Sequence, residues 1–361
     1  MPNVLFYQGR EQEAYDAFYK ATWSNEQQEM SFYYLAAIDA RAKKYERAYA
    51  HIEKALVKNA HNIKARGLKA YLLRKQGKTD KEETWIGQNL ELDPFDFVSA
   101  NEQIIISAEQ EKTELKQALQ IKMRDFQENY LMTARDYVEF GAYEEAMEML
   151  SSCTRDYPML FYYQAYYAHC LGQKDKKEDF LQKAEKANPD YCFPNKLEDI
   201  KVLQFAIENG CKAKACYYLG NLFYDKKQWE ESISLWESSV EADDTFSIVW
   251  RNLALAYYNK AKDSDKAKTA MEKAYALDTS NMRIFLELDQ LYKKLGWTFE
   301  ARLANYEACG ELIESRDDLY MEYITLVNLC GDHEKAYECI MGHHFHPWEG
   351  GEGKVTLLSA H

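Results

Sequence analysis

The sequence predicts an all-α protein, a right-handed α-solenoid (superhelix) built from repeated pairs of helices. Two observations support this prediction. The 361 residues include only 15 glycines and 6 prolines, and amphipathic segments recur at a spacing of 34 residues. An all-β chain of this length would need many more turn residues. A fixed period of this size is typical of solenoids, in which each repeat buries its apolar face only against its neighbours.

The period is clearest at the positions just before each amphipathic helix. Gly9, Lys43 and Gly77 follow one another at intervals of 34 residues, and two of the three are glycine. We expect a tight turn between two helices at each of these positions. Similar starting points recur later in the chain, at Gly141, Gly172, Lys227, Asp265, Gly296 and Gly331.

A second set of positions lies inside the second helix of each pair. In most repeats this position is occupied by a small residue, namely Ala14, Ala48, Ala267, Ala301 and Ala336. In the third repeat it is occupied by Glu82. Antiparallel helices approach closely only where a small side chain replaces a bulky one, so we expect these positions to be buried. The residue four positions later is larger and should pack toward the neighbouring repeat, as expected for Phe18, Ile52, Leu150, Trp236, Met271 and Ile340.

Two segments depart from the period and suggest how the chain is organised. Residues 95–129 have helical polarity without a clear register, and residues 191–210 contain one additional helix. We predict N-terminal repeats with a diverged end over residues 1–126, and C-terminal repeats with an extra helix near 194–209 over residues 127–344. A glycine-rich loop and the start of a truncated helix should follow over 345–361. Without a long Ser/Gly linker, we expect one continuous domain.

The repeats resemble the tetratricopeptide repeat (TPR). That pattern couples an aromatic residue, a Leu-Gly pair and a tyrosine in the first helix with spaced alanines in the second. Its clearest copy here consists of Tyr217, Leu219, Gly220 and Phe223, followed by Trp229, Ser232, Trp236 and Ser239. The resemblance implies a solenoid of TPR-like helix pairs and says nothing about the ligand.

The second half also resembles the C-terminal repeat region of a family of large bacterial proteins. The strings that carry this resemblance occur in order, and they are FPNKLEDIKVL from Phe193, WRNLALAYYN from Trp250, LELDQLYKKLG from Leu286 and FHPWEGGEGKV from Phe345. Members of that family carry an N-terminal β-rich domain of unknown function, related to galactose-mutarotase-like sandwiches. The resemblance implies that this chain is a piece of a longer protein whose β-rich domain is a partner.

Composition argues against several classes of function. With 45 Lys and Arg against 59 Asp and Glu, the formal charge is −14, whereas a nucleic-acid binder needs a basic face. No apolar stretch approaches a membrane span, and the eight cysteines form no CxxC pair, which favours free thiols in the cytoplasm. We recognise no catalytic motif, and predict a non-enzymatic chain without cofactor or metal.

The candidate binding groove lies on the first helices of the pairs, which form the inner face of a solenoid. We expect an exposed stripe there, with Tyr33, Arg41, Tyr71 and Arg74 in the first half. Asparagine would bond a peptide backbone and arginine its carboxylates, whereas tyrosine and arginine equally suit sugar hydroxyls. A merely solvated amphipathic face is the third interpretation. The predicted groove residues are Tyr217, Asn221, Tyr224, Arg251, Tyr258 and Arg283.

The most unusual stretch is the glycine-rich string near the C-terminus, which follows two adjacent histidines, His343 and His344. Adjacent histidines at a helix end point in different directions, so we predict no metal site. The loop either closes the last repeat, with a packed tryptophan and a glutamate capping the next helix, or docks on another domain. Its candidate residues are His346, Trp348, Glu349, Glu352 and Lys354.

The sequence therefore predicts a scaffold or binding module whose groove holds a protein or peptide segment. The alternative is an accessory repeat domain of a carbohydrate-active protein, in which the C-terminal loop completes a sugar-binding site.

Overall fold

The computed structural model describes residues 2–346, and every regular element in that range is a helix. The prediction of an all-α solenoid of helix pairs is confirmed, whereas its right-handed sense stays a prediction. The chain divides into two compact units after Cys211. The predicted boundary between residues 126 and 127 falls inside the first unit, and the division into repeat arrays on either side of it also stays a prediction.

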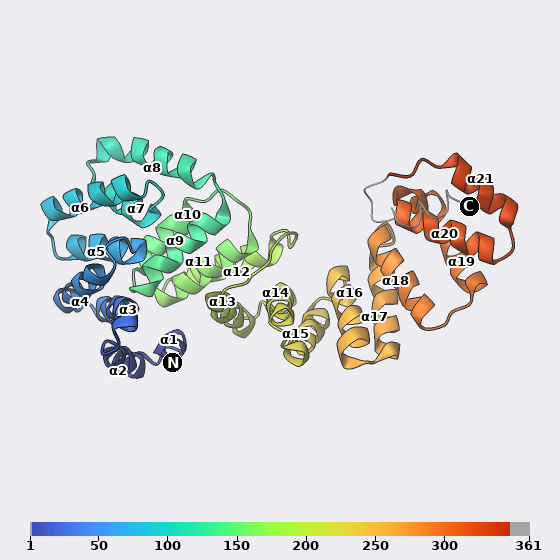
Figure 1. The fold of residues 1–361 in the computed structure, drawn as a ribbon, viewed down its shortest axis with the longest axis horizontal. Helices are drawn as coiled ribbons and strands as arrows, with labels where there is room; N and C mark the ends of the chain where they lie inside the picture. Colours follow the sequence, from blue (N-terminus) through green and yellow to red (C-terminus); the bar gives the residue numbers. More distant parts are fainter. Residues whose placement is uncertain (1, 347–361) are drawn as a thin grey trace. The chain divides into compact units, whose positions relative to one another are not determined.

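The first unit consists of helices that pack on one another largely in chain order (Figure 1). They are α1 (Pro2–Tyr7), α2 (Glu11–Ala21), η1 (Asn25–Gln27), α3 (Gln28–Arg41), α4 (Tyr45–Lys58), α5 (Ile63–Lys75), α6 (Thr79–Leu92), α7 (Phe97–Ile106), α8 (Glu109–Met123), α9 (Gln127–Glu139), α10 (Tyr143–Ser151), α11 (Pro158–Cys170), α12 (Lys174–Lys186) and α13 (Leu197–Glu208). The last of these is the extra helix expected near residues 194–209.

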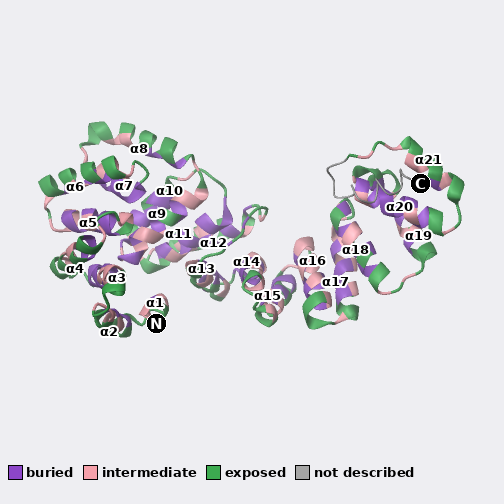
Figure 2. Ribbon diagram, viewed as in Figure 1, coloured by how far each residue is buried: buried purple, intermediate pink, exposed green. Residues whose placement is uncertain are grey.

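The second unit continues the pairing. Its helices are α14 (Lys212–Asp225), α15 (Trp229–Ala242), α16 (Ser247–Ala256) with a π-helical continuation η2 (Tyr257–Ala261), α17 (Ser264–Leu277), α18 (Met282–Lys294), α19 (Phe299–Cys309), η3 (Gly310–Ser315), α20 (Asp317–Leu329) and α21 (His333–Gly342). Buried residues lie mainly along the helix sides that face neighbouring helices (Figure 2).

The 34-residue spacing of glycines has its cause in the turn between the two helices of a pair. Gly9, Lys43 and Gly77 have φ angles of 74°, 56° and 68°, in the left-handed region. The following amide then bonds back across the turn, as Lys44 N does to the carbonyl of Asp39 at 2.8 Å. This arrangement closes the end of the first helix, and glycine adopts it at little cost because it lacks a Cβ atom.

The small positions of the second helices are buried as predicted, with one exception. Ala14, Ala48 and Ala267 have no exposed surface, but Ala301 is exposed. In that repeat the buried position belongs to the next residue, Arg302, which is 1% exposed and lies 35 residues after Ala267. The predicted register is therefore wrong by one residue there, because an arginine with buried carboxylate partners occupies the place of an alanine.

In the first unit the inner face is closed by its own side chains. The hydroxyl of Tyr33 donates to Glu139 Oε2 at 2.5 Å, and Arg41 Nε donates to the Glu139 carbonyl at 2.8 Å. Tyr71 is 4% exposed and packs on Phe140, with ring centroids 4.8 Å apart. The prediction that Tyr33 and Tyr71 lie on an exposed stripe is wrong, because α9 packs on α3 at Tyr33 and Phe140, which follows α9, covers Tyr71 of α5.

Glu82 occupies a position that alanine holds in other repeats. The residue is 1% exposed, and its Oε1 has no hydrogen-bond partner among residues 2–346. Burial, followed by the nearby charge of Glu102, raises the pKa of Glu82 from 4.5 to about 7. The folded protein therefore holds this proton more tightly than the unfolded chain. Stability should be lost as the pH rises from about 4.5 through 7.

We therefore expect Glu82→Gln to stabilise the protein by about 1–3 kcal/mol at pH 8 and to change little at pH 4.5. The neutral amide keeps the size of the side chain and removes the buried charge. Urea unfolding at both pH values measures the difference, with Glu83→Gln, an exposed neighbour on the same helix, as control. An equal effect of Glu82→Gln at both pH values would contradict this explanation.

Candidate functional site

The candidate site lies in the second unit, on the first helices of successive pairs, α14, α16 and α18. Its first element is Asn221 on α14, whose Oδ1 accepts hydrogen bonds from Trp236 Nε1 and from Asn252 Nδ2, each at 3.2 Å. Gly220 permits this arrangement, since a Cβ atom there would lie only 2.5 Å from Trp236 Nε1. The Leu-Gly pair of the repeat pattern thus makes room for the tryptophan that orients Asn221.

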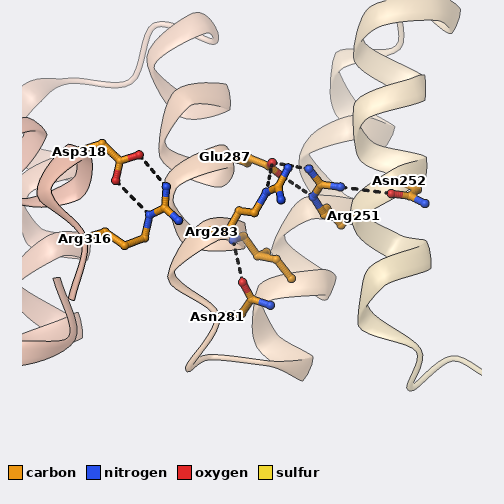
Figure 3. A network of polar contacts seen from close by, with 8 residues as sticks. Arg251, Asn252, Asn281, Arg283, Glu287, Arg316 and Asp318 are labelled. Atoms are coloured by element: carbon orange, nitrogen blue, oxygen red, sulfur yellow. Dashed lines mark hydrogen bonds and ion pairs between the residues drawn. The ribbon is translucent and has the colours of Figure 1, made fainter. Parts of the chain in front are cut away.

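The second element is a carboxylate held between two arginines. Arg251 on α16 bonds Glu287 on α18 with two nitrogens, including Nε to Oε2 at 2.5 Å, and Arg283 Nε lies 3.4 Å from Glu287 Oε1 (Figure 3). Arg251 Nη1 also donates to Asn252 Oδ1 at 3.4 Å. These contacts join three helices into one row of polar side chains, which we call the polar ladder: Asn221, Asn252, Arg251, Glu287 and Arg283.

Exposure differs along the ladder and separates two roles. The side chains of Arg251 and Glu287 are 15% and 17% exposed, whereas that of Arg283 is 68% exposed. A bidentate, largely desolvated arginine–carboxylate pair is rigid and geometrically specific. Arg251 therefore stays paired with Glu287, and Arg283 is the arginine of the polar ladder that is accessible to a ligand.

A cavity of about 170 Å³ borders the ladder at Glu287. Its other walls include Leu255, Tyr258 and Leu291, and the ammonium group of Lys294 lies 5.2 Å from the centre of the Tyr258 ring. Tyr258 belongs to η2, the π-helical turn that extends α16. Such turns are rare and are often found at functional sites. The cavity thus combines apolar residues with the amides of Asn259 and Gln290, the carboxylate of Glu287 and one cation, Lys294.

The remaining predicted groove residues have structural surroundings. Tyr217 is 8% exposed and packs on Phe246 at 5.0 Å, so its predicted place on an exposed stripe is wrong. Tyr224 is half-buried against Trp229 and Trp236, at 4.8 and 5.3 Å, and burial raises its pKa. Both side chains are held by aromatic neighbours and support the helices that carry the ladder.

Sequence reasoning missed Asn252, Glu287 and Lys294. A signal for two of them was present, because Asn252 follows Asn221 by 31 residues and Glu287 follows Arg251 by 36, close to one repeat. Complementary polar residues about one period apart on first helices are expected to meet across neighbouring repeats. Lys294, the last residue of α18, follows Tyr258 by 36 residues, but a lysine and a tyrosine are not a complementary charged pair, so this spacing did not single it out.

Of the C-terminal candidates, His346 is described and the others, Trp348, Glu349, Glu352 and Lys354, lie outside the described residues. The backbone N–H of His346 donates to Asp317 Oδ2, and His343 Nε2 lies 3.0 Å from Asp317 Oδ1. Asp317 is buried at the start of α20. Although burial opposes its ionisation, the bonds from these histidines lower its pKa overall.

The metal-binding capacity of residues 2–346 and the state of two buried thiols limit the chemistry of this part of the chain. Groups of three or more His, Cys, Asp or Glu side chains suited to a metal ion are absent from this range. Burial raises the pKa of Cys192 and Cys211 to about 12, which keeps these thiols protonated and unreactive. Within the same range, no helix combines the length and apolarity needed to cross a bilayer.

The fold defines a helical-repeat protein of the solenoid class. No family model matches the sequence. Among solved structures, this chain is similar to MamA of Desulfovibrio magneticus RS-1, in a structure that covers residue 41 to the end. The sequence identity is 19%, the match covers 53% of this chain and 96% of that chain, and the TM-score is 0.28.

It is also similar to YrrB, described as a TPR protein with an unusual peptide-binding site, at 18% identity, with 65% of this chain and 96% of that chain covered and a TM-score of 0.24. The TPR domain of P58(IPK) matches at 15% identity over 92% of this chain and 97% of that chain, with a TM-score of 0.27. Similarities this low say nothing about a ligand of this protein.

Proposed function

We propose that the protein is a non-catalytic binding module that holds an extended peptide segment on the face formed by α14, α16 and α18. The observation that carries this proposal is the polar ladder with an adjoining cavity. The side chains of Asn221, Arg251 and Glu287 are already fixed by their contacts, so binding would cost them little further ordering. On a face that is only solvated, we would not expect Trp236 and the Arg251–Glu287 ion pair to fix the orientation of Asn221 and Asn252.

The ladder offers groups that recognise a peptide backbone. Trp236 and Asn252 both donate to the oxygen of Asn221, and this fixes the orientation of its amide. The amide nitrogen of Asn221 has no partner among the described residues, and a carboxamide N–H donates readily to a backbone carbonyl. Recognition of an extended segment through its main chain, with pockets for individual side chains, is a general mode of peptide binding.

The cavity and the cations define the side chains that such a segment should carry. At about 170 Å³ the cavity is smaller than the roughly 300–1,000 Å³ typical of small-molecule sites, so a single apolar side chain suits it better. Lys294 at the edge of the cavity favours a carboxylate beside that side chain, and the exposed Arg283, about 16 Å away along α18, favours a second acidic group. The proposed ligand is an extended segment with an apolar residue next to Asp or Glu.

Selection from a random twelve-residue peptide library with the full chain, followed by fluorescence anisotropy, tests the proposal. Enriched peptides should pair an apolar residue with an acidic one. The double variant Arg283→Ala/Lys294→Ala should weaken their binding at least tenfold, since hydrogen bonds to charged groups contribute about 1.5–3 kcal/mol.

The matched control is Lys273→Ala/Lys335→Ala, which removes the same charge from exposed sites on α17 and α21. It should leave the affinity within twofold. Failure to enrich any peptide, or equal weakening in the two double variants, would contradict the proposal. The carbohydrate alternative depends on the C-terminal loop, most of which lies outside the described residues.

A further inference from the structure

A second candidate site, separate from the polar ladder, lies entirely within the first unit. It is a cavity of about 200 Å³ bordered by α1, α3, α9, α10, α11 and α13. Five tyrosines line it, and we call it the tyrosine cavity: Tyr7, Tyr143, Tyr163, Tyr166 and Tyr167. Buried aromatic walls of this kind suit a flat or ring-shaped ligand.

Arg135 of α9 borders this cavity, and no carboxylate oxygen lies within hydrogen-bond distance of it among the described residues. Its side chain is 11% exposed, yet the nearest carboxylate oxygens, from Glu128 and Asp199, lie at 3.9 and 4.0 Å. These distances are too long for hydrogen bonds. The oxygens of Asp199 are instead occupied by the Tyr163 hydroxyl at 2.6 Å and by the amides of Asn195 and Lys196, both at 2.8 Å.

A guanidinium has five N–H donors, and burying one with few partners is costly. Burial lowers the pKa of Arg135, but Tyr163, Asp199 and Glu128 raise it overall, so its guanidinium stays charged beside the cavity. An acceptor from outside the chain, above all a carboxylate, would satisfy the donors and the charge together.

The charged side chains that line the tyrosine cavity balance in number, with Arg41, Arg135 and Lys201 against Glu11, Glu139 and Glu198. Arg41 is used by Glu11 and by backbone carbonyls, and the carboxylate of Glu139 is used by Tyr33 and Lys64. Lys201 lies 5.5 Å from the Tyr166 ring and has no carboxylate within 4.0 Å among the described residues. Beside Arg135 and Lys201, Glu198 is the remaining acid, so two cations face one carboxylate.

We propose that the tyrosine cavity binds a small carboxylate whose body is a single ring. The carboxylate would pair with Arg135 and Lys201, the ring would pack on the tyrosines, and Glu198 would accept from a hydroxyl of the ligand. The volume is below the roughly 300 Å³ at which larger small-molecule sites begin, which limits the body to about one ring. This site is independent of peptide binding on the second unit.

Isothermal titration of the full chain with two pairs of compounds tests the proposal. The carboxylates are 4-hydroxybenzoate and D-glucuronate, and their neutral counterparts are 4-hydroxybenzyl alcohol and D-glucose. At least one carboxylate should bind at least ten times more tightly than its counterpart. The pair that responds distinguishes an aromatic acid from a sugar acid.

Substitutions of single residues show in which cavity the carboxylate binds. Arg135→Gln and Lys201→Gln should each weaken the binding carboxylate at least fivefold, and Lys201 is exposed, so its variant should fold normally. Arg135 also borders a neighbouring cavity of about 540 Å³, which Lys196 lines and Lys201 does not. Lys196→Gln is therefore the matched control and should leave the affinity within twofold.

Three results would overturn the proposal. The first is that neither carboxylate binds with a Kd below about 10 mM, and the second is that each neutral counterpart binds as tightly as its acid. The third is a loss of binding with Lys196→Gln but not with Lys201→Gln, which would place the ligand in the neighbouring cavity instead.

Discussion

Replacing Arg302 with methionine is expected to lower the free energy of unfolding by about 3–5 kcal/mol, because removing one partner of a buried ion pair leaves an uncompensated charge. Arg302 is 1% exposed and bonds Asp289 at 2.8 and 2.6 Å and Glu322 at 2.7 Å. Methionine fills much of the space but leaves Asp289 with the Tyr306 hydroxyl, at 3.0 Å, as its remaining partner here.

The matched control is the preceding residue. Ala301→Leu should change stability by less than about 0.5 kcal/mol, because this side chain is exposed in the structure. Urea unfolding followed by circular dichroism measures both variants. If Ala301→Leu destabilised the protein more than Arg302→Met, the register predicted from the sequence, with Ala301 buried, would be right. The register of the structure, with Arg302 buried, would then be wrong.

Arg74→Met should have an effect of similar size in the first unit, about 3–5 kcal/mol. Arg74 bonds Glu102 with two nitrogens at 2.6 and 3.1 Å and Glu145 at 2.7 Å, and the Glu102 side chain has no exposed surface. These contacts join α5 to α7 and α10. After the substitution Lys75 still pairs with Glu145 at 3.1 Å, but Glu102 loses its cation.

Arg155→Met tests whether the loss of any arginine has this effect. Its side chain is 61% exposed and lies 3.4 Å from Asp125, an ion pair that should contribute less than about 1 kcal/mol. Thermal melting of both variants at one pH gives the comparison. Equal melting temperatures for Arg74→Met and wild type would show that α7 and α10 do not depend on this ion pair.

Most of the fold could be predicted from the sequence, because its determinants are local. The left-handed turns at Gly9 and Gly77 recur with the period of one helix pair, and small residues such as Ala48 mark the close contacts. The single register error, at Ala301, arose where a buried ion pair replaced an alanine contact. An arginine with two carboxylates on other helices gives no local signal.

The candidate sites were less predictable, because the exposure of a side chain on a first helix depends on which helices from other repeats pack over it. Tyr33 and Arg74, like the ladder residues, lie on the first helices of their pairs, yet in the first unit they contact residues about 30 to 100 positions away. Asn221, Arg251 and Arg283 were expected to line one groove, and the contacts with Asn252 and Glu287 connect them, while the groove itself stays a prediction. Whether that surface binds a peptide stays a prediction.

The central claim, that a peptide lies along the polar ladder, is tested most directly by site-specific photo-crosslinking. Benzoylphenylalanine would replace Gln290, an exposed residue of α18 that lines the cavity, or Thr269, an exposed residue of α17 that does not line it. With a library-selected peptide bound, we expect a cross-linked product from position 290 and none from position 269. Equal cross-linking at both positions, or a product from position 269 alone, would contradict the claim.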